Sequence, residues 1–261
     1  MPFASLPGAR LYYEVHGLAI GEAPVIVFAH GAGGNHMSWW QQVPHFSPRY
    51  TCITFDHRGW GASVDESGEG ALRFVDDLLG LMDLLGVTRA ALVAQSMGGW
   101  TSLGLALRAP KRVTHLVMSD THGGTTGDGI PGWTGGPPPD PVTGYHPAAG
   151  ETMLSEQPAF NFLYWQITAT NPPLDAEKRR LLIDPRVVST TAQVSTLKVP
   201  TLFITGEEDV VIPPAVIEAT AALIEGARVV RFPKSGHSVH FERAGMWNRL
   251  VEDFISSPAS H

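Results

Sequence analysis

The stretch Ala90-Ala-Leu-Val-Ala-Gln-Ser96-Met-Gly-Gly99 decides how the rest of this chain is arranged. Its first half, residues 90–94, is a short apolar run that predicts a buried strand, and residues 97–107 carry apolar side chains at helical spacing. Ser96 therefore falls where a strand gives way to a helix. Because two glycines follow shortly after it, helix and strand can approach closely, and a tight turn can hold the Ser96 hydroxyl above the edge of the sheet.

Length, composition and charge limit the class of protein. The 261 residues, 43% of them hydrophobic, suffice for one large α/β domain with room for an insertion. The formal net charge of −7 argues against nucleic acid or an anionic membrane surface as a partner. The sequence shows neither a signal-peptide pattern nor an apolar run of bilayer-spanning length. Cys52 is the only cysteine, which excludes an intrachain disulfide, and we expect a cytoplasmic protein.

Predicted strands and helices alternate along most of the chain. Apolar, β-branched runs indicate strands at residues 25–29, 50–56, 90–94, 113–118, 201–205 and 227–232, and the alternating residues 10–16 suit an edge strand. Apolar residues at helical spacing predict helices at residues 71–85, 97–107, 214–225 and 239–255. This alternation favours a parallel, doubly wound sheet with helices on both faces.

The alternation stops between residues 121 and 196. Gly and Pro dominate residues 123–147, which have no period, and so long an irregular stretch within a compact domain is typical of a functional insertion or lid. The alternative is a disordered linker, which the prolines at 137–139 would fit. Against a linker stand several large aromatic residues, namely Trp133, Tyr145, Phe160, Phe162, Tyr164 and Trp165. We therefore expect a core formed by residues 1–121 and 197–261, with a cap formed by residues 122–196.

Residues with catalytic potential follow three of the predicted strands. In a parallel doubly wound sheet, ligands bind at the carboxyl ends of the strands. A serine hydroxyl becomes an effective nucleophile when a base lies within hydrogen-bond reach and an acid orients that base. Asp209 follows the strand at 201–205, and His237 follows the strand at 227–232. The chain thus supplies a serine, an acid and a base in the order Ser96, Asp209, His237.

Five short motifs carry a resemblance to a known family. In chain order they read His30-Gly31, Asp56-His-Arg-Gly-Trp-Gly-Ala-Ser63, Ala94-Gln-Ser-Met-Gly-Gly99, Gly206-Glu-Glu-Asp209 and Ser235-Gly-His237. With them the chain resembles the α/β-hydrolase family from about Leu11 to Phe254, although Ala94 replaces the first glycine of the usual G-x-S-x-G. The resemblance implies a mostly parallel, eight-stranded doubly wound sheet flanked by helices, with a cap insertion.

The resemblance also assigns roles to individual residues. Ser96 would be the nucleophile, and His237 the base that takes its proton and later hands it to the leaving group. Asp209 would hold the imidazole in the required tautomer. The backbone N–H groups of Ala32 and Met97 would form the oxyanion hole.

Alternatives to these roles follow from neighbouring residues. Asp120 or Glu208 could replace Asp209 as the acid, and His240 could replace His237 as the base. The histidines lack the spacing of zinc ligands, and no glycine-rich phosphate loop follows the first central strand, so we expect no metal and no other cofactor.

A serine nucleophile predicts acyl transfer to water. We expect a carboxylic-ester hydrolase acting on small, rather apolar ester or lactone substrates, with hydrolysis of a C–C bond or an enol-lactone from aromatic-compound degradation as the alternative. A small-molecule receptor that uses a hydrolase pocket is the alternative of another class. The expected pocket residues are His30, Trp39, Trp40, Trp100, His122, Trp133 and Trp165. Any of the aromatic rings could instead simply pack the cap onto the core.

Overall fold

A computed structural model describes residues 2–133 and 136–257, and its centre is one twisted sheet. Eight strands follow each other in the order β1-β2-β4-β3-β6-β7-β10-β11, and a short ninth strand, β5, pairs with β2. The strands from β4 to β11 run parallel, whereas β1 and β2 are antiparallel. The mostly parallel eight-stranded sheet expected from the sequence is thereby confirmed. The strands are β1 Phe3–Leu6, β2 Ala9–Gly17, β3 Val25–Ala29, β4 Thr51–Phe55, β5 Val64–Asp65, β6 Ala90–Gln95, β7 Val113–Ser119, β10 Thr201–Gly206 and β11 Arg228–Phe232.

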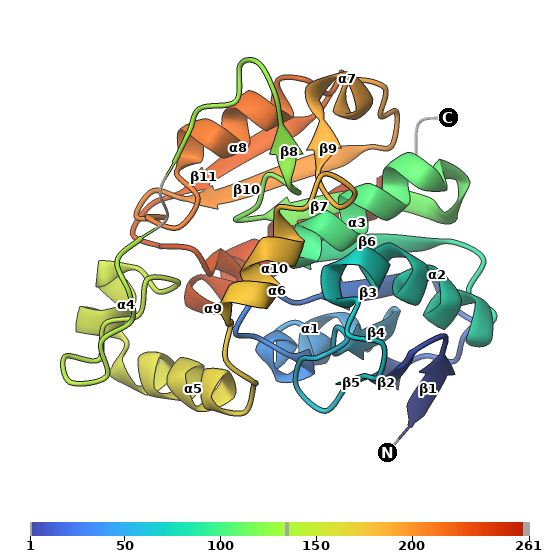
Figure 1. Cartoon of the computed structure of the whole chain (residues 1–261), viewed down its shortest axis with the longest axis horizontal. Helices are drawn as coiled ribbons and strands as arrows, with labels where there is room; N and C mark the ends of the chain where they lie inside the picture. Colours follow the sequence, from blue (N-terminus) through green and yellow to red (C-terminus); the bar gives the residue numbers. More distant parts are fainter. Residues whose placement is uncertain (1, 134–135, 258–261) are drawn as a thin grey trace.

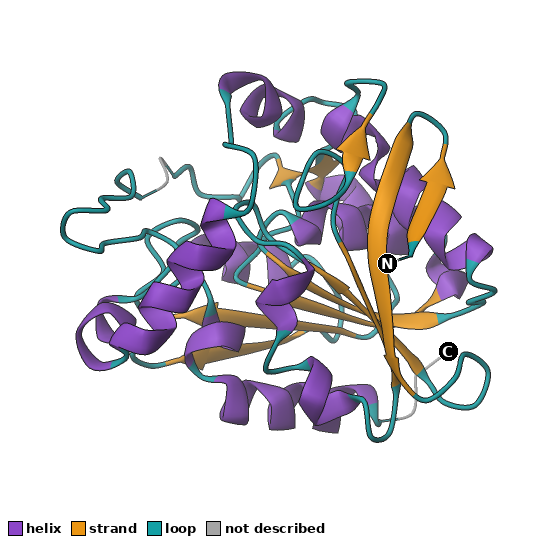
Figure 2. Ribbon diagram, turned by 90° about the horizontal axis from the view of Figure 1, so that it is seen from below, coloured by secondary structure: helices purple, strands orange, loops and turns teal. Residues whose placement is uncertain are grey.

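Helices cover both faces of this sheet (Figures 1 and 2). One face carries α2 (Phe74–Leu84), α3 (Gly98–Arg108) and α8 (Pro214–Ala221), and the other carries α1 (Val43–Phe46) and α10 (Ala244–Ile255). Strand β3 illustrates why: Val25, Val27 and Ala29 join the apolar cluster under the first set of helices, whereas Ile26 and Phe28 join the second cluster. Successive side chains of a strand point to opposite faces, so a continuous apolar strand requires a cover on both sides.

Two elements differ from the sequence prediction. Strand β2 is not an edge strand, because β1 pairs along its outer side. The single helix predicted over residues 239–255 is broken into α9 (Val239–Glu242) and α10, since Arg243 leaves the helical region with φ −130° and ψ 37°. Both helices bury apolar side chains, and hydrophobic spacing therefore does not reveal a break of one residue.

The cap region is folded in its described part. It contains helices α4 (Glu151–Glu156), α5 (Pro158–Ala169), α6 (Ala176–Leu182) and α7 (Thr191–Val194), and a parallel pair of two-residue strands, β8 (Thr125–Thr126) and β9 (Ser189–Thr190). Met153 and Ile167 pack with Phe241 of α9 and attach the first two helices to the core. We propose residues 122–196 as its extent. Residues 1, 134–135 and 258–261 of the expected core and cap ranges lie outside the described residues.

None of the described helices is long and apolar enough to span a bilayer.

The turn between β6 and α3 depends on two glycines. A Cβ atom placed on Gly98 would lie 2.1 Å from the carbonyl oxygen of Ala29 in β3, and one on Gly99 would lie 2.3 Å from the Thr121 hydroxyl. The contact at Gly98 is with backbone, which cannot move aside as the end of a side chain can. Because neither Gly98 nor Gly99 carries a Cβ atom, the first turn of α3 can lie this close to the sheet.

We expect Gly98→Ala to lower the free energy of unfolding by about 1–3 kcal/mol, because a methyl group is forced against the backbone of β3. Urea unfolding measures this. The matched control is Gly245→Ala at the start of α10, where only the Arg249 guanidinium lies near, at 3.9 Å, and where helix propensity favours alanine by up to about 1 kcal/mol. Equal stability of the two variants would contradict the close approach as a constraint.

Candidate active site

Ser96 lies in a strained turn at the carboxyl end of β6. Its φ is +47°, in the left-handed region that residues other than glycine rarely adopt. The strain is held by hydrogen bonds on both sides: the Ser96 amide donates to the Ser119 carbonyl at 3.1 Å, and the Gly99 amide donates to the Ser96 carbonyl at 2.8 Å. This conformation presents the hydroxyl group at the end of the sheet, and the residue remains partly exposed.

The structure brings Ser96, His237 and Asp209 together in one chain of hydrogen bonds. The Ser96 hydroxyl lies 2.7 Å from Nε2 of His237, and Nδ1 of the same ring lies 2.8 Å from Oδ2 of Asp209. The second carboxylate oxygen of Asp209 accepts the amides of Val211 and Ile212, both at 2.9 Å. The acid is therefore held on both oxygens, and it orients a ring that reaches the serine.

The charge of Asp209 adapts His237 to proton transfer. Burial disfavours the imidazolium, but the adjacent Asp209 carboxylate and its hydrogen bond outweigh burial and raise the pKa of His237 above its ordinary value. A higher pKa makes the ring a stronger proton acceptor.

The two alternative acids have other partners. Glu208 turns away to the cap, where it accepts the hydroxyl of Thr152 at 2.6 Å and its amide at 3.0 Å. Asp120 is fully buried and accepts the amides of Gly206 at 3.2 Å and Val239 at 3.1 Å. Burial, followed by the charge of Asp209, raises the pKa of Asp120 well above its ordinary value. Neither carboxyl group is hydrogen bonded to His237, whereas that of Asp209 is.

His240, the alternative base, lies in the core. Its two ring nitrogens are buried and have no hydrogen-bond partner among the described residues, and the ring packs on Trp39 with centroids 4.7 Å apart. Burial and the nearby charge of His237 lower the pKa of His240 to about 3, so the ring stays neutral.

Two backbone amides next to Ser96 are free to donate. Within residues 2–133 and 136–257, neither the Ala32 N–H nor the Met97 N–H has a hydrogen-bond acceptor. A Cβ atom on Gly31 would lie 1.9 Å from the Gln95 side chain and 2.9 Å from Cβ of Ser96, which places the His30-Gly31 loop directly against the serine turn. This geometry is compatible with an oxyanion hole formed by the two amides.

The polar residues of the Asp56–Ser63 motif pair with other protein groups in the nearby loops and in α2. The Asp56 carboxylate accepts the amide of His36 at 2.7 Å and that of Ala62 at 2.8 Å, which closes the turn after β4. The buried Arg58 guanidinium forms a two-point ion pair with Asp77 of α2 at 2.5 and 2.6 Å. These contacts fix the loops around the site.

The expected pocket residues fall into three groups. His30 and Trp39 are fully buried, and both ring nitrogens of His30 are engaged, with the Gly31 carbonyl and with His57. Trp40 packs on Phe160 and Phe241, where cap and core meet. The remaining expected residues contact two histidines. Trp100 of α3 and Trp133 of the cap pack on His122, whose pKa is lowered by burial and by the charge of His237, and Trp165 packs on His146.

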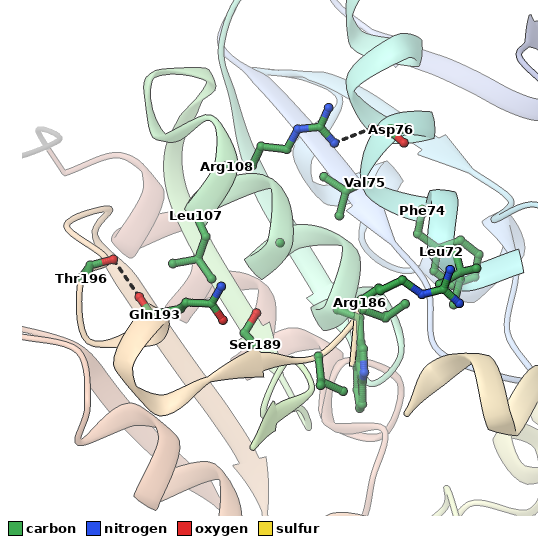
Figure 3. Close-up of a pocket in the computed structure, with 15 residues that line it drawn as sticks. Leu72, Phe74, Val75, Asp76, Leu107, Arg108, Arg186, Ser189, Gln193 and Thr196 are labelled. Atoms are coloured by element: carbon green, nitrogen blue, oxygen red, sulfur yellow. Dashed lines mark hydrogen bonds and ion pairs between the residues drawn. The ribbon is translucent and has the colours of Figure 1, made fainter. Parts of the chain in front are cut away.

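A cavity of about 440 Å³ lies beside α3 (Figure 3). Its lining includes Phe74 and Val75 of α2, Leu107 and Arg108 of α3, and Arg186 of the cap. Trp100 also lines this cavity and packs on His122 with ring centroids 4.9 Å apart. Trp100 thus lies between this cavity and the surroundings of His122.

Sequence reasoning missed three residues next to His237. Glu242 accepts the Gly236 amide at 3.0 Å and the Gly150 amide of the cap at 3.2 Å, and burial raises its pKa to about 7. Tyr164 accepts the hydroxyl of Ser238 at 3.2 Å, and the ring of His146 lies against Tyr164. The sequence pointed to His146 only through the aromatic residues near it in the glycine-rich segment. No group of three or more His, Cys, Asp or Glu side chains in the described part of the chain could hold a metal ion.

The sheet topology and the hydrogen-bonded Ser–His–Asp chain are those of a hydrolase of the α/β fold. Residues 24–138 and 145–244 match the profile of the alpha/beta hydrolase fold family, and the chain belongs to this family.

Three relatives show how the chain is related within the family. The protein named "Putative carbamate hydrolase RutD" of Caulobacter sp. (strain K31) is 26% identical over 96% of this chain and 97% of its own length. The enol-lactonase from Burkholderia xenovorans LB400 is 25% identical, with a TM-score of 0.82 over 98% of this chain and 100% of its own. Est816, an N-acyl homoserine lactone degrading enzyme, is 25% identical, with a TM-score of 0.78 over 97% and 100% of the two chains.

We expect Asp209→Asn to lower the pKa of His237, because the carboxylate is what raises it against the effect of burial. A proton–nitrogen NMR titration of the histidine rings measures this. The control is Asp253→Asn, which removes one carboxylate from the exposed side of α10 and should leave the His237 titration unchanged. An unchanged titration in Asp209→Asn would contradict the electrostatic coupling.

Proposed function

We propose that this protein is a serine hydrolase that cleaves carboxylic esters of small, rather apolar substrates through an acyl-enzyme intermediate. The observation that carries the proposal is the hydrogen-bonded chain from Ser96 through His237 to Asp209. A serine hydroxyl 2.7 Å from a base, with that base 2.8 Å from an orienting acid, is the arrangement that activates a hydroxyl group.

In the proposed acylation step, the Ser96 hydroxyl oxygen attacks the ester carbonyl carbon, and its proton passes to Nε2 of His237. The Ala32 and Met97 amides donate to the oxyanion that forms, and each such donor contributes about 3–4 kcal/mol to stabilisation of the transition state. When the tetrahedral intermediate collapses, the bond to the leaving oxygen breaks and His237 returns the proton to that oxygen. The alcohol departs, and the acyl group remains on Ser96.

Deacylation repeats the same chemistry with water. His237 takes a proton from a water molecule, whose oxygen attacks the acyl carbon, and then returns that proton to the Ser96 oxygen as the carboxylic acid leaves. Asp209 stabilises the imidazolium in both steps without taking up a proton.

Lactones are a second candidate substrate class. Two structural neighbours that match nearly the whole chain are named for lactone substrates. A lactone is a cyclic ester, so the same steps apply, except that the leaving hydroxyl stays attached to the acyl group. The receptor alternative predicts binding without turnover, and the hydrogen-bonded triad favours turnover.

We expect Ser96→Ala to lower kcat by roughly 10⁴-fold or more, with nearly unchanged thermal stability. The assay uses p-nitrophenyl esters from acetate to octanoate together with γ-butyrolactone. A fluorophosphonate should label the wild-type protein stoichiometrically, at Ser96 only. Well-folded wild-type protein that turns over none of these substrates, or a label on another residue, would overturn the proposal.

The role of Asp209 is tested against that of Asp120. We expect Asp209→Asn to lower kcat by on the order of 10³- to 10⁴-fold, because the imidazole loses its orienting acceptor. Since neutral His237 is the base, the acidic limb of the kcat/KM profile should also move to lower pH in this variant. Asp120→Asn should cost less than about tenfold, because its carboxyl group accepts the amides of Gly206 and Val239 and the Ser119 hydroxyl, and has no hydrogen bond to His237. The reverse order of effects would assign the acid to Asp120.

A further inference from the structure

Two histidines beside His237 have no part in the steps proposed above. His122 follows β7 by three residues, and its ring lies between Trp100 and Trp133, with centroids 4.9 and 4.5 Å away. The residue is 1% exposed, and its Nδ1 atom is buried without a hydrogen-bond partner among the described residues. Buried polar atoms are nearly always paired, so this unpaired atom requires an explanation.

His146 approaches the same base from the cap. Its ring lies between Tyr164 and Trp165, with centroids 5.0 and 5.1 Å away, and Tyr164 accepts the hydroxyl of Ser238, the residue after His237. The Ala148 amide donates to Nδ1 of His146 at 3.1 Å. A neutral imidazole whose Nδ1 accepts a hydrogen bond carries its proton on Nε2.

The surroundings of His122 favour the same tautomer. A buried N–H group without an acceptor is rarer than a buried unpaired acceptor, so the sealed Nδ1 atom favours placing the proton on Nε2. In the described part of the chain, no residue accepts a hydrogen bond from Nε2 of either ring. Each histidine therefore has one N–H group left to donate.

Both rings are uncharged at neutral pH. Burial, followed by the positive charge that His237 acquires, lowers the pKa of His122 and of His146 to about 4. Among the described residues, the Asp209 carboxylate is the main charge that acts on His237, because burial raises the pKa of Asp120 and favours its neutral form. A carboxylate on the substrate would thus enter a buried site beside the Asp209 carboxylate, at a high desolvation cost.

We propose that His122 and His146 select ester substrates with a second, uncharged oxygen acceptor, such as a ketone or amide carbonyl, and discriminate against substrates with a carboxylate. This inference rests on the proposed esterase function and specifies its substrate class. The two Nε2–H groups donate to the acceptor oxygen, and the flanking tryptophan and tyrosine rings cover the apolar remainder of the substrate. The donors are neutral, so they add no charge that would lower the basicity of His237.

Two matched substrate series test the selection. The acyl series consists of the p-nitrophenyl esters of hexanoate, 5-oxohexanoate and monoadipate, which are apolar, keto and carboxylate analogues of similar size. The ring series compares γ-butyrolactone with N-butanoyl homoserine lactone, which adds an amide. In at least one series, wild-type kcat/KM should favour the acceptor-bearing member about tenfold or more over the apolar one. Monoadipate should be the poorest acyl substrate.

The test variants replace histidine with amide residues whose nitrogen falls near one or the other ring nitrogen. The amide nitrogen of glutamine falls near Nε2 of histidine and that of asparagine near Nδ1, so His122→Gln should retain part of the preference, whereas His122→Asn and His122→Phe should abolish it. The same three changes at His146 form an independent series if a variant at the more buried His122 fails to fold. The readout is the ratio of kcat/KM for the acceptor-bearing substrate to kcat/KM for p-nitrophenyl hexanoate, measured in each folded variant, because only the first substrate has an acceptor to lose.

The outcomes separate this inference from the function on which it rests. If the wild-type protein hydrolyses hexanoate but prefers the acceptor-bearing member in neither series, or if all variants keep the preference, the role of the histidines is refuted and the esterase function stands. If wild-type protein hydrolyses no member of either series, both proposals are overturned.

Discussion

The backbone of the β6–α3 turn depends on a contact that only glycine permits. Gly98 lies so close to the Ala29 carbonyl that no side chain fits between them, and this approach lets Ser96 adopt its φ of +47°. The Ser96 amide in turn donates to β7, the next strand, so three neighbouring strands define the position of one hydroxyl group. The remaining site residues are useful only because this position is fixed: His237 reaches Ser96 from a loop that follows the sheet's far edge strand.

The electrostatics around His237 follow from burial of several acids at one place. Asp209, Asp120 and Glu242 are all buried near the base, but burial raises the pKa of Asp120 and Glu242, which favours their neutral forms. Asp209 holds one oxygen against the imidazole and the other against two backbone amides. The protein thus directs one charge at the histidine, and it surrounds the same ring with the neutral imidazoles of His122, His146 and His240.

Local pattern was sufficient to predict the fold and the grouping of Ser96, Asp209 and His237, because both depend on short segments. Apolar strands, helical spacing and five motifs placed Ser96, Asp209 and His237 after the carboxyl ends of the strands now seen as β6, β10 and β11. The features that the sequence pattern did not predict depend on contacts between segments that are far apart in the chain. His30 pairs with His57 rather than facing a substrate, Glu208 bonds to the cap rather than to the base, and Glu242 joins two segments 86 residues apart, Gly150 and Gly236. None of these partners can be inferred from spacing within one helix or loop.

The way the cap is attached affects how the substrate specificity of such an enzyme can be altered by exchanging its cap. Gly150 and Thr152 of the cap are held by Glu242 and Glu208. Both carboxylates also adjoin the catalytic residues: Glu208 precedes Asp209, and Glu242 of α9 accepts the Gly236 amide next to His237. Transplanting a cap from a relative therefore replaces part of the support of the catalytic residues. A chimera that keeps residues 150–152 retains that support, while the segments on either side remain open to exchange.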